Sequence, residues 1–290
     1  MRLVTFRVDG GSRLGVVRDD DEVVELSEPA DMRLLIEAGE EGLAAARATL
    51  DSSRARAHRL ADIELRPPLP DPAGNVIAIG RNYQKHAQET AVMEGREPSP
   101  PTIFTKAITS LTEPYADIAV DPEVSDKLDW EVELGVVIGK KGANIKRDRA
   151  RAFVFGYMVV NDVTARDIQS SWGGQYFKGK SLDRSSPTGP WIVTPNEIPD
   201  PQSLHLRLHV NGTLKQDGST RDMIYPVDAI IEWVSIGMTL LPGTIIATGT
   251  PDGVGFARTP PEFLKPGDLM ETEVEGIGKL RNRIVSAARD

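Results

Sequence analysis

The sequence predicts a β-rich α+β protein, and three observations support this fold class. Apolar or alternating runs of strand length recur along the chain between turn signals. Helix-like segments are fewer and scattered, which disfavours the regular strand–helix alternation of a doubly wound sheet. A stretch with four prolines in seven residues, at 66–72, is typical of a linker. We therefore expect a small N-terminal α+β domain (1–66), a linker (67–73) and a larger β-rich domain (74–290).

The expected elements follow in order along the chain. Asp-Gly-Gly and Asp-Asp-Asp turn signals separate the first apolar runs, and a helix-like stretch rich in Ala, Leu, Glu and Arg follows them. In the larger domain, Asn211-Gly212 is a hairpin signal, and Pro226 suits the first residue of a helix. The expected strands are 3–6, 14–17, 22–26, 75–79, 153–160, 204–210, 244–248 and 269–274, and the expected helices are 31–50, one after Asn82, one after Asp162, and 226–238.

Composition excludes several classes of function. The 290 residues carry a net charge of −9 and no basic stripe, which argues against nucleic-acid and anionic-membrane partners. With no cysteine, disulfides, thiolate metal sites and cysteine nucleophiles are excluded. The first residues lack the apolar core of a signal peptide, and no run of 18 apolar residues occurs. We expect a soluble, cytoplasmic protein.

Two glutamates lie two residues apart inside an otherwise apolar run at 129–136. At the strand period of two, Glu131 and Glu133 leave the same face, roughly 7 Å apart along the chain. Adjacent buried carboxylates are costly unless a proton or a cation holds them together. The pattern thus suggests a bound hard cation, although a half-buried strand with a solvated acidic face explains it equally well.

A third carboxylate strengthens the metal interpretation. Asp162 stands where an apolar strand ends, and Arg166 and Gln169 follow it at helical offsets of four and seven. By itself, this pattern fits an N-cap aspartate with an intrahelical Asp–Arg pair better than it fits a metal ligand. Combined with Glu131 and Glu133, however, Asp162 completes an all-oxygen ligand set that suits Mg²⁺ or Mn²⁺ rather than zinc.

A candidate general base follows the strand at 75–79. His86 and Glu89 are three residues apart and share a helix face, so the carboxylate can orient the imidazole to take a proton from water. A surface helix solvated by a Lys85–Glu89 pair is the alternative explanation.

Residues 174–181 match the phosphate-loop pattern G-x-x-x-x-G-K-[ST]. A phosphate loop must leave a buried strand and open a helix. Here the preceding residues are polar and helix-like, and the following residues 182–190 contain two prolines and cannot start a stable helix. We therefore disfavour a nucleotide binder. Lys180 remains a candidate cation for a substrate carboxylate or a developing enolate.

A glycine-rich loop at 248–255 follows the strand at 244–248. Its small residues allow close backbone approach to a ligand, and the Thr250 hydroxyl can bond a carboxylate. A plain tight turn explains the loop nearly as well. His205 and His209 are too far apart along one strand to bind a single ion.

Five motifs in this order resemble the fumarylacetoacetate hydrolase family over about residues 74–284. They are Gly-Arg-Asn-Tyr-x-x-His-x-x-Glu from residue 80, Glu-x-Glu from 131, Asn-Asp-x-x-x-Arg-Asp-x-Gln from 161, Gly-Lys-Ser from 179 and Thr-Gly-Thr-Pro-x-Gly-Val-Gly from 248. The resemblance implies a mixed β-roll catalytic domain, usually in a homodimer. Residues 1–66 resemble the small N-terminal domain of many bacterial members.

The resemblance also implies roles for the site residues. It implies a divalent cation, Mg²⁺ or Mn²⁺, on Glu131, Glu133 and Asp162, and a small 2-oxo acid as the substrate. His86 and Glu89 would activate water and Lys180 would stabilise an enolate. The residues that would contact the substrate are Arg166, Gln169 and Thr250.

Hydrolysis of a C–C bond in a 2,4-dioxo acid, such as an acylpyruvate, is the expected reaction because His86 and Glu89 can activate the attacking water. Oxaloacetate decarboxylation and isomerisation of a 2-hydroxyhepta-2,4-diene-1,7-dioate are the alternatives within the resembled family. We further expect residues 91–101 to form a mobile lid. Replacing Glu131 by alanine should abolish Mn²⁺ binding and turnover while leaving the fold intact, because it relieves carboxylate repulsion.

Overall fold

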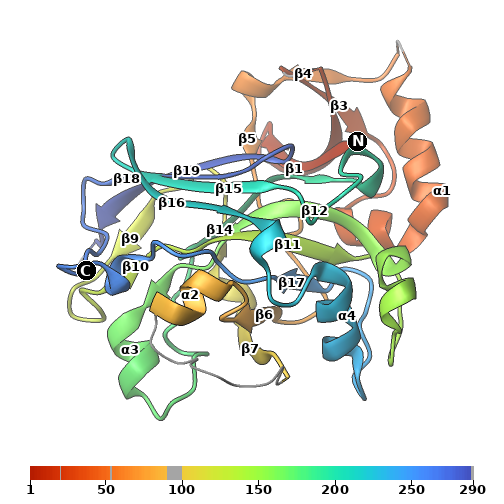
Figure 1. The fold of residues 1–290 in the computed structure, drawn as a ribbon. Coiled ribbons are helices and arrows are strands. Elements are labelled where there is room, and N and C mark those ends of the chain that lie inside the picture. The colour runs from red at the N-terminus through yellow and green to blue at the C-terminus, as the bar shows by residue number, and fades with distance from the viewer. Residues whose placement is uncertain (20, 53, 90–99, 289–290) are drawn as a thin grey trace.

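The computed structural model describes residues 1–19, 21–52, 54–89 and 100–288. In this part of the chain, twelve strands join in one large sheet whose main path is β4-β3-β2-β1-β14-β12-β11-β17-β6-β7, with β5 paired to β1 and β8 to β14 (Figure 1). The strands of this sheet are β1 (Arg2–Val8), β2 (Gly11–Arg18), β3 (Glu22–Leu26), β4 (Ala57–Arg59), β5 (Glu64–Leu65), β6 (Val76–Gly80), β7 (Thr102–Lys106), β8 (Leu111–Thr112), β11 (Val132–Ile138), β12 (Val154–Asn161), β14 (Ser186–Val193) and β17 (Ile245–Ala247).

A second, five-stranded sheet lies against the middle of the large one. Its order is β16-β15-β18-β19-β9, and apolar residues of β15, β18 and β19 share one core with those of β11 and β12. A short pair, β10 with β13, stands apart from both sheets. The remaining strands are β9 (Ile118–Val120), β10 (Leu128–Asp129), β13 (Thr164–Ala165), β15 (His205–Val210), β16 (Thr213–Ser219), β18 (Leu269–Val274) and β19 (Gly278–Ser286).

Four α-helices occur in the described residues. The α1 helix (Met32–Leu50) matches the predicted helix, and the Asp31 carboxylate caps it by accepting a 2.9 Å bond from the backbone N–H of Leu34. The others are α2 (Gln84–Glu89), α3 (Arg166–Ser171) and α4 (Val227–Ser235), and short 3₁₀ helices cover 60–62, 108–110, 147–153, 195–197, 220–222 and 255–257. No helix in the described ranges has the length and apolarity needed to cross a bilayer.

Two of the predicted helices differ in detail. The α4 helix is shorter than the predicted 226–238, and Pro226 is its N-cap rather than its first residue. After Asp162 the chain stays extended for longer than predicted, because Thr164 and Ala165 pair with Asp129 and Leu128. Asp162 is therefore neither the N-cap of α3 nor on one helix face with Arg166, so both helical interpretations were wrong.

The N-terminal strands are part of the large sheet. Arg2 and Leu3 of β1 pair antiparallel with Val193 and Ile192 of β14. Figure 1 shows β1, β3, β4 and α1 at one end of the molecule and α2 and α3 at the other end. The β-rich α+β fold class is confirmed, while the domain boundary at 67–73 stays a prediction.

Candidate active site

The three predicted carboxylates meet where β11 and β12 run side by side. Val132 at the start of β11 pairs with Asn161 at the end of β12, so Glu131 and Asp162, one residue outside each strand, are neighbours. One carboxylate oxygen from each of Glu131, Glu133 and Asp162 lies within 4.8 Å of the others, and all three side chains are buried. Three converging carboxylates are the hard oxygen ligands that Mg²⁺ and Mn²⁺ prefer, so this set fits a divalent cation.

Two lysines approach the same carboxylates. The Lys180 ammonium lies 2.6 Å from Glu131 Oε2 and 2.8 Å from Asp162 Oδ2. Lys106, at the end of β7, lies 2.5 Å from Asp162 Oδ1 and also donates to the carbonyl oxygen of Lys180. Lys180 was predicted from the sequence, whereas Lys106 was not. The available signal was a lysine that ends a strand ahead of the Glu-x-Glu strand.

Charge and burial shift the pKa values of Glu131 and Glu133 in opposite directions. Burial raises the pKa of Glu131, but the cations Lys180 and Arg166 outweigh burial and lower it to about 2. Burial raises the pKa of Glu133 well above its ordinary value, and the neighbouring Asp162 and Glu131 raise it further. In the metal-free protein, Glu131 is therefore an anion, and Glu133 retains its proton at a pH where an exposed glutamate would have lost it.

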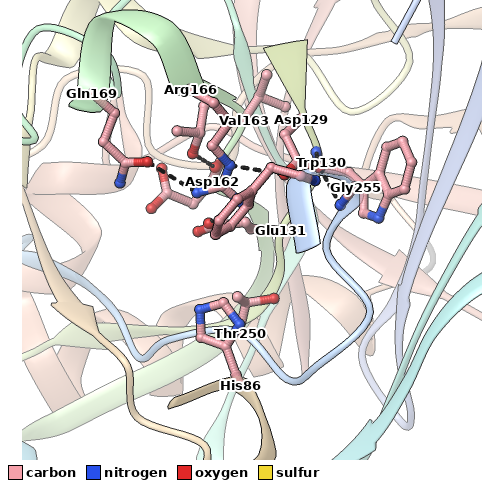
Figure 2. Close-up of polar contacts among 12 residues, drawn as sticks. His86, Asp129, Trp130, Glu131, Asp162, Val163, Arg166, Gln169, Thr250 and Gly255 are labelled. Carbon is pink, nitrogen blue, oxygen red and sulfur yellow. Dashed lines mark hydrogen bonds and ion pairs between the residues drawn. The ribbon is translucent and has the colours of Figure 1, made fainter. Parts of the chain in front are cut away.

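Arg166 reaches the site from the first residue of α3. Its Nε donates a 2.8 Å bond to Asp129 Oδ2, one terminal nitrogen lies 2.7 Å from Glu131 Oε1, and the other donates to Gln169 Oε1 at 3.1 Å. Its guanidinium also lies over the Phe256 ring, 4.3 Å from the ring centre. Figure 2 shows Arg166 and Gln169 next to Asp162 on one side of an open space, with His86 and Thr250 on the other side.

The predicted pairing of His86 with Glu89 is present in α2. His86 Nδ1 lies 2.8 Å from Glu89 Oε1, and the other oxygen of Glu89 accepts a 3.1 Å bond from the backbone N–H of Gly253. An acceptor at Nδ1 fixes the neutral imidazole with its proton on Nδ1 and its lone pair on Nε2. Such a ring is oriented to act as a base.

The glycine-rich loop contacts both sides of the site. The backbone N–H of Gly249 donates a 2.8 Å bond to Glu133 Oε2. At Gly249, φ is +98° and a Cβ would come within 2.7 Å of the Asn82 side chain, so this position needs glycine. The Thr250 hydroxyl accepts a 2.8 Å bond from Gln216 Nε2, a residue that the sequence analysis did not single out.

These residues surround one cavity of about 330 Å³. Seven of the nine predicted site residues line it, whereas Glu89 and Asp162 stand behind His86 and Lys180. Four further lining residues with charged or aromatic side chains were not predicted as site residues, namely Arg81, Phe104, Tyr176 and Phe256.

The segment that matches the phosphate-loop pattern has no phosphate-loop structure. Residues 174–181 form turns, and the next element is β14, with no helix between them. The predicted lid at 91–101 lies outside the described residues except for Pro100 and Pro101.

Comparisons with known proteins agree with this geometry. The family model for the fumarylacetoacetate (FAA) hydrolase C-terminal domain matches residues 75–285. The chain is 38% identical to the oxaloacetate tautomerase YisK of Bacillus subtilis (strain 168), in an alignment that covers 98% of this chain and 100% of YisK. It is 40% identical to the mitochondrial oxaloacetate tautomerase fahd2 of Xenopus laevis, in an alignment that covers 98% of this chain and 90% of that protein.

A solved structure gives a similar result. Maleylpyruvate hydrolase from Sphingobium sp. SYK-6, in complex with manganese (II) ion and pyruvate, aligns over 99% of this chain and 100% of its own, with 30% identity and a TM-score of 0.81. The carboxylate cluster, the family match and the full-length relatives lead to one conclusion. The chain belongs to the fumarylacetoacetate hydrolase family and is an enzyme.

Proposed function

We propose that the protein interconverts the keto and enol forms of a short 2-oxo acid of the oxaloacetate type. The observation that carries the proposal is the position of His86, an oriented base, in the same cavity as the carboxylate cluster and Lys180. Keto–enol interconversion needs a base at the carbon next to the ketone and a positive group at the ketone oxygen. Full-length similarity to two oxaloacetate tautomerases supports the same reaction.

A divalent cation fits the cluster of Glu131, Glu133 and Asp162 because all three offer carboxylate oxygens and are buried together. When bound, such a cation supplies a Lewis acid that withdraws electrons from the 2-oxo group. Both Mg²⁺ and Mn²⁺ suit these ligands, and the manganese of the maleylpyruvate hydrolase structure favours Mn²⁺.

His86 and Lys180 move and stabilise charge in this proposal. His86 Nε2 takes a proton from C3 of the keto form, and Glu89 stabilises the imidazolium that results. The electron pair of the C3–H bond forms the C2–C3 double bond, and the π pair of the C2 carbonyl moves to its oxygen, where the Lys180 ammonium donates a hydrogen bond to the enolate oxygen. A water molecule gives that oxygen its proton, which produces the enol, and the imidazolium of His86 returns the C3 proton to the hydroxide that remains. The reverse sequence returns the ketone.

Hydrolysis of a C–C bond, the reaction expected from the sequence, is the second candidate. The same His86–Glu89 pair can take a proton from water, which then attacks a second carbonyl, and Lys180 would again stabilise the departing pyruvate enolate. The similarity to maleylpyruvate hydrolase favours this candidate. Decarboxylation of oxaloacetate needs the same stabilised enolate but no base.

The test offers the Mn²⁺-loaded protein the enol of oxaloacetate and, separately, an acylpyruvate. Loss of the enol's ultraviolet absorbance measures tautomerisation, and mass spectrometry detects pyruvate, carbon dioxide and carboxylic acids. We expect fast, chelator-sensitive conversion of the enol without loss of carbon. Pyruvate and a carboxylic acid from the acylpyruvate would make the enzyme a hydrolase, and pyruvate with carbon dioxide from oxaloacetate would make it a decarboxylase.

Two histidine variants separate catalysis from structure in this test. His86→Asn should lose enol conversion, because the amide is no base. His205→Asn is the matched control, because His205 is exposed on β15 and does not line the cavity. Equal activity of both variants would contradict the role of His86.

We also propose a homodimer, on the basis of the family resemblance. Light scattering coupled to size-exclusion chromatography measures the mass directly, and a mass near that of one 31.6 kDa chain would contradict the dimer.

A further inference from the structure

Arg81 is a cation of the cavity that no carboxylate neutralises within the described ranges. It lines the cavity, and its one hydrogen bond there goes from a terminal nitrogen to the Tyr176 hydroxyl, at 2.9 Å. By contrast, the site cations Arg166, Lys180 and Lys106 each lie within 2.8 Å of at least one carboxylate oxygen. A guanidinium binds a carboxylate through two parallel hydrogen bonds, so Arg81 is suited to an anionic group of a ligand.

A pair of aromatic side chains connects Arg81 to the lysine of the carboxylate cluster. The ring of its partner Tyr176 packs edge-on against Phe104, with ring centres 5.4 Å apart. The Lys180 ammonium lies 5.2 Å from the centre of the same Phe104 ring. Arg81 and Lys180 therefore contact different members of one aromatic pair, Tyr176 and Phe104, and both cations line the same small cavity.

The backbone at Arg81 is held in an unusual conformation. Its φ is +57°, in the left-handed region that residues with a side chain rarely adopt. The next residue fixes this turn, because the Asn82 amide donates to the carbonyl oxygens of Tyr225 and Thr248 and its oxygen accepts from the N–H of Tyr225. Strain of this kind persists where the surrounding structure requires it, often at binding sites.

We propose that Arg81 binds the distal carboxylate of the substrate, so that the enzyme prefers short dicarboxylates to 2-oxo acids with one carboxylate. The inference rests on the proposed function only in placing the 2-oxo acid end at the carboxylate cluster and Lys180. The other site cations already have carboxylate partners, which leaves Arg81 to neutralise the second charge. The cavity volume of about 330 Å³ suits a ligand of this size.

The test uses two unreactive 2-hydroxy acids that differ at one end. Malate and 2-hydroxybutanoate share the 2-hydroxycarboxylate end, and malate has a carboxylate where 2-hydroxybutanoate has a methyl group. Isothermal titration into the Mn²⁺-loaded protein measures the Kd of each. We expect tighter binding of malate, and we expect Arg81→Gln to weaken malate by about tenfold to a hundredfold without changing the Kd of 2-hydroxybutanoate.

Further variants keep the result interpretable. Arg221→Gln is the matched control, because Arg221 is exposed and lies outside the cavity. Arg81→Lys should recover part of the malate affinity, since the charge remains while the two-point geometry is lost. Unchanged Mn²⁺ affinity in each variant verifies that the carboxylate cluster is intact.

Three outcomes would overturn the proposal. The wild-type protein would bind both acids equally, Arg81→Gln would weaken both acids by the same factor, or Arg81→Gln would weaken neither. Because neither acid has a keto group to enolise, these outcomes do not depend on the reaction. A protein that fails the tautomerisation test but binds malate through Arg81 would lose the proposed function and keep this binding site.

Discussion

The Asp129 carboxylate accepts a 2.8 Å hydrogen bond from Nε of Arg166, and both side chains are buried. The same carboxylate accepts bonds from the backbone N–H groups of Gly255, at 2.6 Å, and Phe256, at 3.0 Å. Figure 2 shows Asp129 between Arg166 and Gly255. Asp129 therefore ties the guanidinium that faces the cavity to the glycine-rich loop, and that loop also holds Glu89 through Gly253.

Replacing Asp129 by asparagine should loosen Arg166. The amide keeps one acceptor oxygen, but its NH₂ group faces N–H donors that bonded the second carboxylate oxygen. It also removes the negative charge that balances the Arg166 guanidinium. We expect the free energy of unfolding to fall by about 3 kcal/mol, as for other broken buried ion pairs, and the KM of the substrate to rise. Denaturant unfolding and steady-state kinetics measure the two effects.

In the double variant with Arg166→Met the unfolding free energy should partly recover, because the unpaired buried charge is gone. No recovery would show that loss of the Asp129–Arg166 pair is not the cause of the lower stability.

The two glutamates of the carboxylate cluster should differ in their effect on stability. Glu131 is the shared counter-charge of Lys180 and Arg166, so Glu131→Gln should lower the unfolding free energy of the metal-free protein by roughly 3 kcal/mol. Glu133 has no cation within ion-pairing distance in the described residues and has a raised pKa, so Glu133→Gln should be nearly neutral. Denaturant unfolding with a chelator present gives both values.

The predicted loss of stability in Glu131→Gln differs from the prediction made from the sequence, in which loss of Glu131 relieves carboxylate repulsion and leaves the fold intact. That reasoning applies to Glu133, whose neighbours raise its pKa, and not to Glu131, whose neighbours lower it. Both variants should still lose Mn²⁺ affinity, which titration calorimetry measures. If the two variants unfold at the same denaturant concentration, the assignment of charges is wrong.

Mn²⁺ binding should release a proton from Glu133. Because its pKa is raised in the metal-free protein, the folded state holds a proton that a carboxylate ligand must lose. Mn²⁺ affinity should therefore rise as the pH rises from about 4.5 through the raised pKa of Glu133. Over the same pH window, the metal-free wild-type protein should lose stability relative to the Glu133→Gln variant, because its folded state binds a proton that its unfolded state has released. Calorimetry in two buffers of different ionisation enthalpy counts the protons, and a heat independent of the buffer would rule out the release.

Local periodicity was enough to predict that Glu131 and Glu133 converge and that His86 pairs with Glu89. Glu131 and Glu133 share a face because strands alternate, and His86 meets Glu89 because helix neighbours lie three residues apart. Both contacts depend on spacings of two or three residues that the sequence displays directly.

Contacts between distant segments could not be predicted in this way. Arg166 bonds Asp129 from 37 residues away because β10 pairs with β13, and that pairing replaced the helical start expected after Asp162. Lys106 reaches Asp162 across 56 residues. Such neighbours follow from strand order and sheet packing, which no local pattern of polar and apolar residues specifies.

Nucleotides should not bind, despite the match of residues 174–181 to the phosphate-loop pattern. A phosphate loop presents backbone N–H groups at a helix N-terminus and an available lysine. Here no helix follows the segment, and the Lys180 ammonium lies against Glu131 and Asp162. Isothermal titration with ATP and Mg²⁺ should give no heat of binding, whereas micromolar affinity would require a different function for the segment.

Variants of the base should separate reactions that need proton removal from decarboxylation. His86→Ala should abolish enol conversion and acylpyruvate hydrolysis, since both need a group that takes a proton, and should spare any decarboxylation of oxaloacetate. Glu89→Gln keeps a group that can accept a hydrogen bond from His86 but loses the charge that stabilises the imidazolium, so we expect a fall in kcat of about a hundredfold or more. Parallel assays of all three reactions with Mn²⁺ measure these effects.

The Mn²⁺ affinity of both variants should match that of the wild type, because His86 and Glu89 are not part of the carboxylate cluster. A variant that loses Mn²⁺ and all three reactions together would instead give His86 a structural role.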